Sequence, residues 1–196
     1  MIDLEPATRA VTALIASIRD DQLDDPTPCD GTSLAAMLDH VEGFATGFTL
    51  AARKQVPPGG SQAPVIDAAR LAPVWRTRMP ARLAELAAAW HEQTAWSGMT
   101  EAGGVPLPGE VAGIFALDEV VVHGWDLAAA TGQRIAFDEA LLVPLHEFLT
   151  AAVARQPDGS PGLFGPPVAV PAGAPLLDRV LGLTGRDPNW SLERTA

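Results

Sequence analysis

The sequence EVAGIFALDEVVVHGWDLAAAT, residues 110–131, is mostly apolar and contains no proline. It follows the loop GGVPLPG at 103–109, whose glycines and prolines interrupt regular structure. Gly132 comes directly after the stretch and can adopt the left-handed conformation that ends many helices. The pattern therefore predicts a helix from about Glu110 to Thr131.

The other long segments also repeat apolar residues at spacings of three and four, which is the pattern of amphipathic helices. The eighteen prolines and eighteen glycines gather in the loops between them. We expect helices at about Glu5–Asp21, from a cap at Thr32 or Ser33 to near Arg53, across Ile66–Trp96 with an irregularity near Pro73 or Pro80, from the cap Asp138 to Ala154, and at Leu176–Leu183. The segment Val168–Val170 is expected to be strand-like.

These segments together predict an all-α fold. It would be a four-helix bundle with an additional C-terminal helix and a Pro/Gly-rich tail that contains the short strand-like segment. A chain of 196 residues, 47% of them hydrophobic, is long enough to bury a core and short enough to be one unit. We therefore expect a single domain over residues 1–196.

The charge and the termini exclude several classes of function. A formal net charge of −11 would repel a phosphate backbone, so a nucleic-acid partner is not expected. No segment reaches the roughly 18 uninterrupted apolar residues of a membrane span, and the N-terminus has no secretory signal. The single cysteine, Cys29, cannot form an internal disulfide, which agrees with a reducing compartment. We expect a cytoplasmic protein with no membrane partner.

Three polar side chains are candidates for a metal site. Glu119 and His123 are four residues apart on the predicted helix, so they lie within about 40° of each other around its axis. His40 borders the apolar face of another predicted helix, and facing helices of a bundle can direct side chains to one point. Two imidazoles and one carboxylate suit zinc, and also nickel, iron or manganese, and leave a coordination position open. Asp126 is expected to orient an imidazole N–H, with a fourth ligand or a buried hydrogen-bonding group as alternatives.

Spacing alone does not separate a metal site from a solvated or hydrogen-bonded Glu–His pair. Cys29 could be a reactive thiol near a helix N-terminus, but the simpler interpretation is a small buried apolar residue. The remaining candidates receive surface or packing roles: His91 and His146 on the surface, Trp125 as a packing anchor, and Asp39 and Asp118 facing solvent or helix ends.

Three stretches carry a resemblance to a known family. They are PTPCDG at 26–31 leading to LDHV at 38–41, EVVVHGWDLA at 119–128, and the tail with FGPPVAVP at 164–171, Asp178-Arg179 and GRDP at 185–188. In these motifs the chain resembles the mycothiol-dependent maleylpyruvate isomerase-like metal-binding proteins, a branch of the DinB-like four-helix bundle superfamily. The resemblance implies a metal held by His40, Glu119 and His123.

The chain departs from the family pattern in two places. Thr32 stands where the family usually has a tryptophan after the Cys-x-Gly turn, so packing at the mouth of the site is expected to differ. The isomerases also have an additional C-terminal domain that contributes to the active site, and this chain is expected to be a short form without it. Isomerase activity on maleylpyruvate is therefore not implied.

The leading functional hypothesis is a thiol-dependent metalloenzyme, with mycothiol as the co-substrate and S-transfer, isomerisation or hydrolysis as the reaction. An open metal position that binds a small-molecule thiol or substrate would supply this chemistry. The alternative is a non-catalytic metal-binding or interaction module, and a third hypothesis is a scaffold with vestigial ligands. Bundles of this kind often pair, so a homodimer is also expected.

Overall fold

The computed structural model describes residues 1–160 and 163–192, and it is predominantly helical. Six α-helices carry most of the structure: α1 Glu5–Ile15, α2 Leu34–Ala52, α3 Trp75–His91, α4 Gly109–Thr131, α5 Glu139–Arg155 and α6 Leu176–Leu183. Short 3-10 turns lie at Asp20–Gln22, Ala68–Arg70 and Gln93–Trp96, and one hairpin consists of β1 Met99–Ala102 and β2 Val105–Pro108. The all-α prediction is confirmed.

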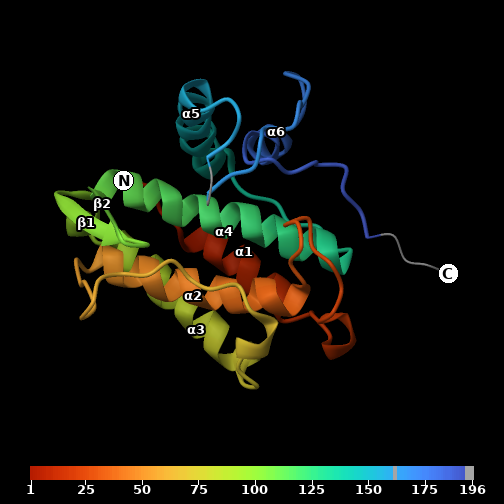
Figure 1. Cartoon of the computed structure of the whole chain (residues 1–196), viewed down its shortest axis with the longest axis horizontal. Helices are drawn as coiled ribbons and strands as arrows, with labels where there is room; N and C mark the ends of the chain where they lie inside the picture. The colour runs from red at the N-terminus through yellow and green to blue at the C-terminus, as the bar shows by residue number, and fades with distance from the viewer. Residues whose placement is uncertain (161–162, 193–196) are drawn as a thin grey trace.

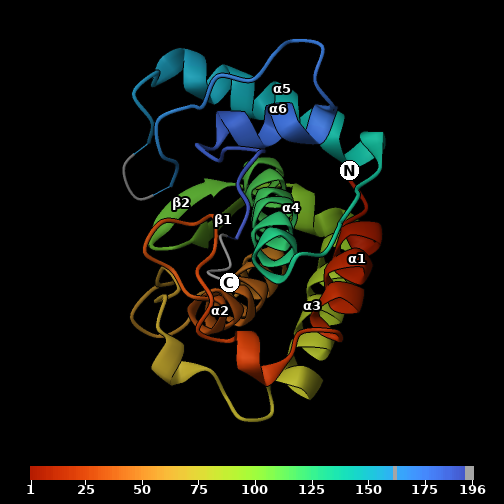
Figure 2. The same cartoon turned by 90° about the vertical axis from the view of Figure 1, so that its right-hand side faces the viewer.

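Helices α1 to α4 form the bundle. Both α1 and α2 pack against α3 and α4, so the order around the bundle is α1, α3, α2, α4. Figure 2 looks nearly along α4, with α1, α2 and α3 gathered on one side of it. Phe44, Trp90 and Leu127 come from three of these helices and are almost completely buried. Each such side chain contributes roughly 1.5–3 kcal/mol through its removal from water.

The two helices that carry the candidate metal ligands have well-defined ends. The side chain of Ser33 accepts a hydrogen bond from the backbone N–H of Ala36, at 3.3 Å, and so caps the start of α2. Gly132 has φ of 68° and ends α4 in the left-handed conformation, as predicted. These ends define where α2 and α4 begin and stop, and so where their candidate ligands lie along the bundle axis.

The predicted loop at 103–109 is wrong, because most of it belongs to the hairpin. Gly103 and Gly104 have φ of 58° and 80°, the left-handed values that a tight two-residue hairpin turn requires. Strand β1 pairs with β2 in antiparallel register, from Met99 opposite Pro108 to Ala102 opposite Val105. The glycine pair thus marks a hairpin turn, and the hairpin lies against α2 and α4 (Figure 1).

Two other predicted boundaries need correction. Helix α1 ends at Ile15, before the predicted Asp21, and a 3-10 turn replaces its last part. The region Ile66–Trp96 is divided into the helix α3 and two flanking 3-10 turns. Pro80 lies inside α3, and Pro73 precedes it, so the break falls on the N-terminal side of the helix.

Helices α5 and α6 pack on each other, and α5 also contacts α4. Figures 1 and 2 show this pair on the side of α4 that faces away from α2 and α3. Residues 168–170, expected to be strand-like, join no sheet. The N–H of Val168 instead donates a hydrogen bond to the carbonyl of Gly182, at 2.9 Å, which holds this segment against α6.

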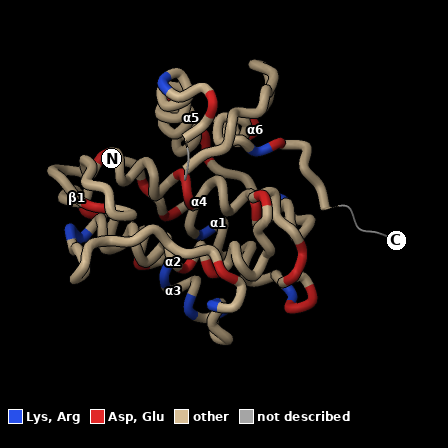
Figure 3. Tube along the Cα trace, viewed as in Figure 1, with Lys and Arg blue, Asp and Glu red and all other residues tan. Residues whose placement is uncertain are grey.

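Among the described residues, no helix is both long enough and apolar enough to cross a bilayer. Figure 3 shows acidic positions along much of the chain and few basic ones. Several arginines of α3 are already paired with carboxylates, including Arg76 with Asp20 and Arg78 with Glu42. The basic side chains of α3 are therefore largely neutralised by ion pairs.

Candidate metal centre

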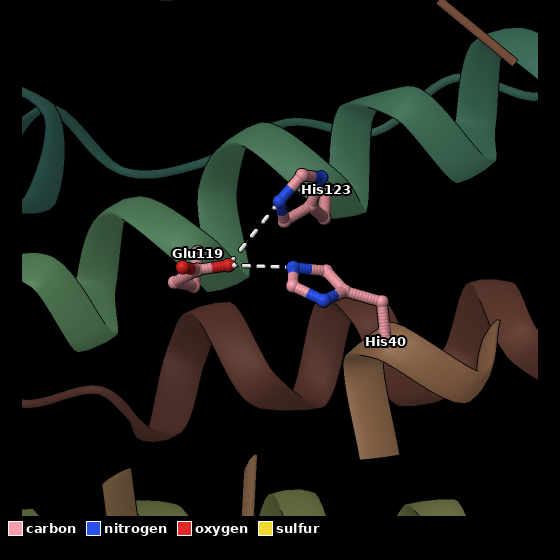
Figure 4. A group of neighbouring side chains, drawn as sticks. All are labelled: His40, Glu119 and His123. Atoms are coloured by element: carbon pink, nitrogen blue, oxygen red, sulfur yellow. Dashed lines mark hydrogen bonds and ion pairs between the residues drawn. The ribbon is translucent and has the colours of Figure 1, made fainter. Parts of the chain in front are cut away.

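Helices α2 and α4 bring His40, Glu119 and His123 together at the inner face of the bundle (Figure 4). Nε2 of His40 and Nε2 of His123 each lie 3.2 Å from the same atom, Oε2 of Glu119. One ligand atom from each residue lies within 4.8 Å of the others. The convergence predicted from sequence is thus present, and metal binding itself stays a prediction.

The local charges favour an ionised carboxylate between two imidazoles. Burial alone would raise the pKa of Glu119, but the hydrogen bonds from His123 and His40 lower it well below the ordinary range. Burial alone would lower the pKa of His123, but its hydrogen bonds to Asp126 and Glu119 raise it to about 10. Without a metal, His123 is therefore protonated at neutral pH and forms an ion pair with Glu119.

Asp126 lies behind His123, where it acts on the ring nitrogen that does not face Glu119. Its Oδ2 is 2.9 Å from Nδ1 of His123, and its side chain has no exposed surface. This agrees with the expected role of orienting the imidazole, because an N–H held at Nδ1 leaves Nε2 as the coordinating atom. The position behind the ring also argues against Asp126 as a fourth ligand.

Arg186, from the C-terminal tail, completes this chain of contacts. Its Nη2 and Nε lie 3.1 Å and 3.4 Å from the two carboxylate oxygens of Asp126. The guanidinium compensates a carboxylate that would be costly to bury alone. Arg186 is a site residue that the motifs did not predict, although a buried Asp126 requires a cationic or hydrogen-bonding partner.

His40 is held mainly by packing. Its ring meets the edge of Phe44 with centroids 5.7 Å apart, and meets His123 at 4.7 Å and 90°. Its Nδ1 is buried without a hydrogen-bond partner among the described residues. The two ring contacts and the hydrogen bond of Nε2 with Glu119 together orient the ring.

A pocket of about 490 Å³ opens beside the three residues. Phe115, Phe164 and Ile66 supply apolar wall, while Cys29 and Arg186 supply polar groups. This volume is in the range of small-molecule sites, which are concave, mostly apolar and carry a few placed polar groups. The candidate ligands thus face a space that a substrate can enter.

The predicted position of Asp118 is wrong. It was assigned to solvent or helix ends, but it is only 5% exposed and lines the same pocket. Burial and the charge of Glu119 raise the pKa of Asp118 to about 7. Its spacing from Phe115 and Val122, three and four residues, is a signal that could have placed it on the inner face.

The other candidates are not part of this centre. His91 is exposed at the end of α3, and His146 is half-buried near Arg179 in a different pocket, between α5 and α6. Trp125 is half-buried, and Asp39 is within 3.8 Å of Arg70. Cys29 is half-buried and packs against the hydrophobic core, so it is less buried than the simpler interpretation expects.

The donor set fits a divalent metal ion. Two imidazole nitrogens and one carboxylate oxygen are the ligands of many zinc and other transition-metal sites. Nearly complete burial of His40 and Asp126, together with the contact between Asp126 and His123, supplies the rigid surroundings that such ligands need. Three ligands leave at least one position for a substrate atom or water.

Comparison with known proteins agrees with these features. A family model described as the mycothiol maleylpyruvate isomerase N-terminal domain matches residues 4–128. The chain belongs to this family. The matched range includes α2 and most of α4, and therefore all three candidate ligands.

Two uncharacterized proteins, from two strains of Mycobacterium tuberculosis, are similar to this family member. Each is 31% identical to it over 184 residues, which cover 92% of this chain and 93% of the relative. The family likeness thus extends along nearly the whole chain.

Two solved structures share the fold. A crystal structure of the mycothiol-dependent maleylpyruvate isomerase superimposes with a TM-score of 0.66 at 18% identity, over 93% of this chain and 86% of that one. A histidine-to-alanine mutant of such an isomerase gives 0.58 at 17% identity, over 77% and 68%. The first match includes residues beyond 128, so the common fold is not confined to the range of the family model.

Proposed function

We propose that this protein is a thiol-dependent metalloenzyme whose divalent ion, zinc by preference, is held by His40, Glu119 and His123. The observation that carries the proposal is that Nε2 of both histidines lies 3.2 Å from one oxygen of Glu119, beside a pocket large enough for a small molecule. Nickel, iron and manganese suit the same donors. The family description names mycothiol, and we extend it to this chain as the co-substrate.

When bound, the ion would polarise a substrate carbonyl or acidify a coordinated thiol, which is the chemistry of an open metal position. The chain's own residues orient the reactants. Asp126 would fix the tautomer of His123, and Phe115 and Phe164 form an apolar part of the pocket wall. The proposed reaction is S-transfer, isomerisation or hydrolysis.

A non-catalytic metal-binding module is the second candidate function. It would require that the ion be enclosed by protein ligands, as in structural sites. The position of Asp126 behind His123 does not supply a fourth ligand, and this favours the enzyme. We further propose a cytoplasmic location, a single functional domain and a homodimer.

The proposal predicts that His123→Ala loses the metal. Protein purified without a nickel column should contain about one equivalent of metal per chain, and the variant should contain less than a tenth of it. Elemental analysis measures this, and a titration with mycothiol should then give binding only to the metal-containing protein. His91→Ala, which changes an exposed histidine, is the matched control. Equal metal content in wild type and His123→Ala would refute the site.

A further inference from the structure

The loop 27–32 presents Cys29 to the pocket of the proposed metal centre. The N–H of Thr27 donates to the carbonyl of Thr32, and the N–H of Thr32 donates to the carbonyl of Cys29, both at 3.0 Å. Gly31, at φ of 68°, allows the tight turn between them. An isolated antiparallel β-bridge between Pro26 and Ser33 then connects the loop to the start of α2. The position of Cys29 is thus fixed relative to His40.

Cys29 is accessible from the pocket and has a guanidinium nearby. Its side chain is half-buried and lines the same pocket as Glu119, His123 and Arg186. Arg186 and Cys29 are close enough that a charge on Cys29 contributes to the raised pKa of Arg186. Because Cys29 is partly exposed on the pocket wall, a disulfide that enters the pocket can reach its sulfur.

An independent observation indicates that a polar ligand enters this pocket. Asp118 is 5% exposed and lines the pocket, and its Oδ1 has no hydrogen-bond partner among the described residues. A buried acceptor without a donor is costly, and a ligand with hydroxyl or amide groups would satisfy it. A sugar-containing thiol such as mycothiol carries several such donors, so Asp118 is placed to bind the polar part of the molecule.

We propose that Cys29 is a thiolation site, at which the disulfide of the protein's own low-molecular-weight thiol forms a mixed disulfide. The thiolate of Cys29 attacks one sulfur of the symmetric disulfide, RSSR, and forms Cys29–S–S–R. The RS–SR bond breaks, RS⁻ leaves and takes up the proton that Cys29 released. Cys29 is oxidised and the leaving sulfur is reduced, so no other reactant is required.

The modification would regulate the metal centre. Because Cys29 and the three candidate ligands line one pocket, the attached thiol fills the space through which a substrate reaches them. Excess reduced thiol reverses the step by the same exchange reaction. The identity of the thiol rests on the proposed function, whereas the position of Cys29 does not.

The test compares thiolation of Cys29 with that of a cysteine placed elsewhere. The zinc-treated wild type and the double variant C29S/A81C, whose cysteine is at an exposed position of α3, are treated with mycothiol disulfide and with glutathione disulfide. Intact-protein mass spectrometry then gives the rate of each modification. We expect mycothiol disulfide to modify the wild type on the order of tenfold faster than glutathione disulfide, and the relocated cysteine to show no such preference. Equal preferences in the two proteins would overturn the proposal.

The outcomes also separate this inference from the proposed function. Wild type that binds zinc and mycothiol but shows no selective thiolation refutes the role of Cys29 alone. Selective thiolation of a protein that binds no zinc supports the role of Cys29 and refutes the metal centre. Cys29→Ser, treated in parallel, must stay unmodified, because the chain has no other cysteine.

Discussion

A single carboxylate oxygen organises the candidate centre. Oε2 of Glu119 contacts Nε2 of both His40 and His123. The buried Asp126 contacts the other ring nitrogen of His123, and Arg186 forms an ion pair with Asp126. Each of these polar groups therefore has its charge or its orientation stabilised by its neighbour. A metal ion at the centre would replace the ion pairs of Glu119 with coordination bonds and leave the outer contacts of Asp126 unchanged.

Asp126→Asn should weaken zinc binding about 10–100-fold, the usual effect of removing the hydrogen-bond partner of a metal-bound histidine. The amide keeps the shape of the carboxylate but loses its charge and can present its N–H₂ group to His123. A competition titration with a zinc-binding dye measures the change. Asp39→Asn, next to His40 but paired with Arg70, should bind zinc as the wild type does. Equal affinities of the two variants would contradict this account of Asp126.

Zinc binding should release about one proton per chain at pH 8. His123 has a pKa raised to about 10 in the metal-free protein, so the ion must displace its proton, whereas Glu119 is already ionised. The same raised pKa stabilises the metal-free protein below about pH 6.5, the ordinary histidine pKa. That stability is lost as the pH rises toward 10. Calorimetry in buffers of different ionisation enthalpy counts the protons, and a count near zero would show that His123 is neutral before binding.

The residues of the site were predictable to different degrees. His40, Glu119 and His123 follow from helical spacing and from the family motifs. Asp118 was misplaced because a charged residue was assumed to face solvent, although its spacing from Phe115 indicates the inner face. Arg186 could not be placed from spacing at all, since its contact with Asp126 spans sixty residues and depends on the path of the tail.

Contact between the bundle helices depends on small residues at particular positions. A Cβ at Gly124 of α4 would lie 2.6 Å from Cγ2 of the buried Val11 on α1. By contrast, a Cβ at Gly47 of α2 would meet nothing within 4 Å. The two glycines therefore differ in what they contribute: Gly124 allows close approach of two helices, whereas Gly47 only weakens a helix.

Gly124→Ala should lower the free energy of unfolding by about 1–2 kcal/mol, because overpacking outweighs the better helix propensity of alanine. Gly47→Ala should raise it by about 0.5–1 kcal/mol, since only the propensity changes. Urea denaturation of metal-free protein measures both. A stabilising effect at both positions would show that α1 and α4 are less tightly packed than described.

Most helices were predictable because each buries one regular apolar stripe, and the caps at Ser33 and Gly132 mark their ends. The hairpin was missed because Val105–Pro108 is short and contains two prolines, which the sequence presents as a loop. The tail 168–170 looks strand-like in sequence, but it finds its hydrogen bond on α6 and has no partner strand.

At the scale of the whole molecule, the bundle, the loop 27–32 and the C-terminal tail meet at one pocket. The bundle supplies the candidate metal ligands, the loop supplies Cys29, and the tail supplies Arg186. Helix α5 joins the tail to α4, so the pocket needs the chain well beyond the residues that the family model matches. The site is therefore a property of the complete fold.

Anomalous diffraction from crystals grown with zinc, recorded on both sides of the zinc absorption edge, shows whether an ion binds between His40, Glu119 and His123. We expect one strong zinc peak, within about 2.0–2.2 Å of Nε2 of His40, Nε2 of His123 and a carboxylate oxygen of Glu119, with a non-protein atom in a remaining position. No peak between these three side chains, or a peak bound elsewhere on the chain, would contradict it.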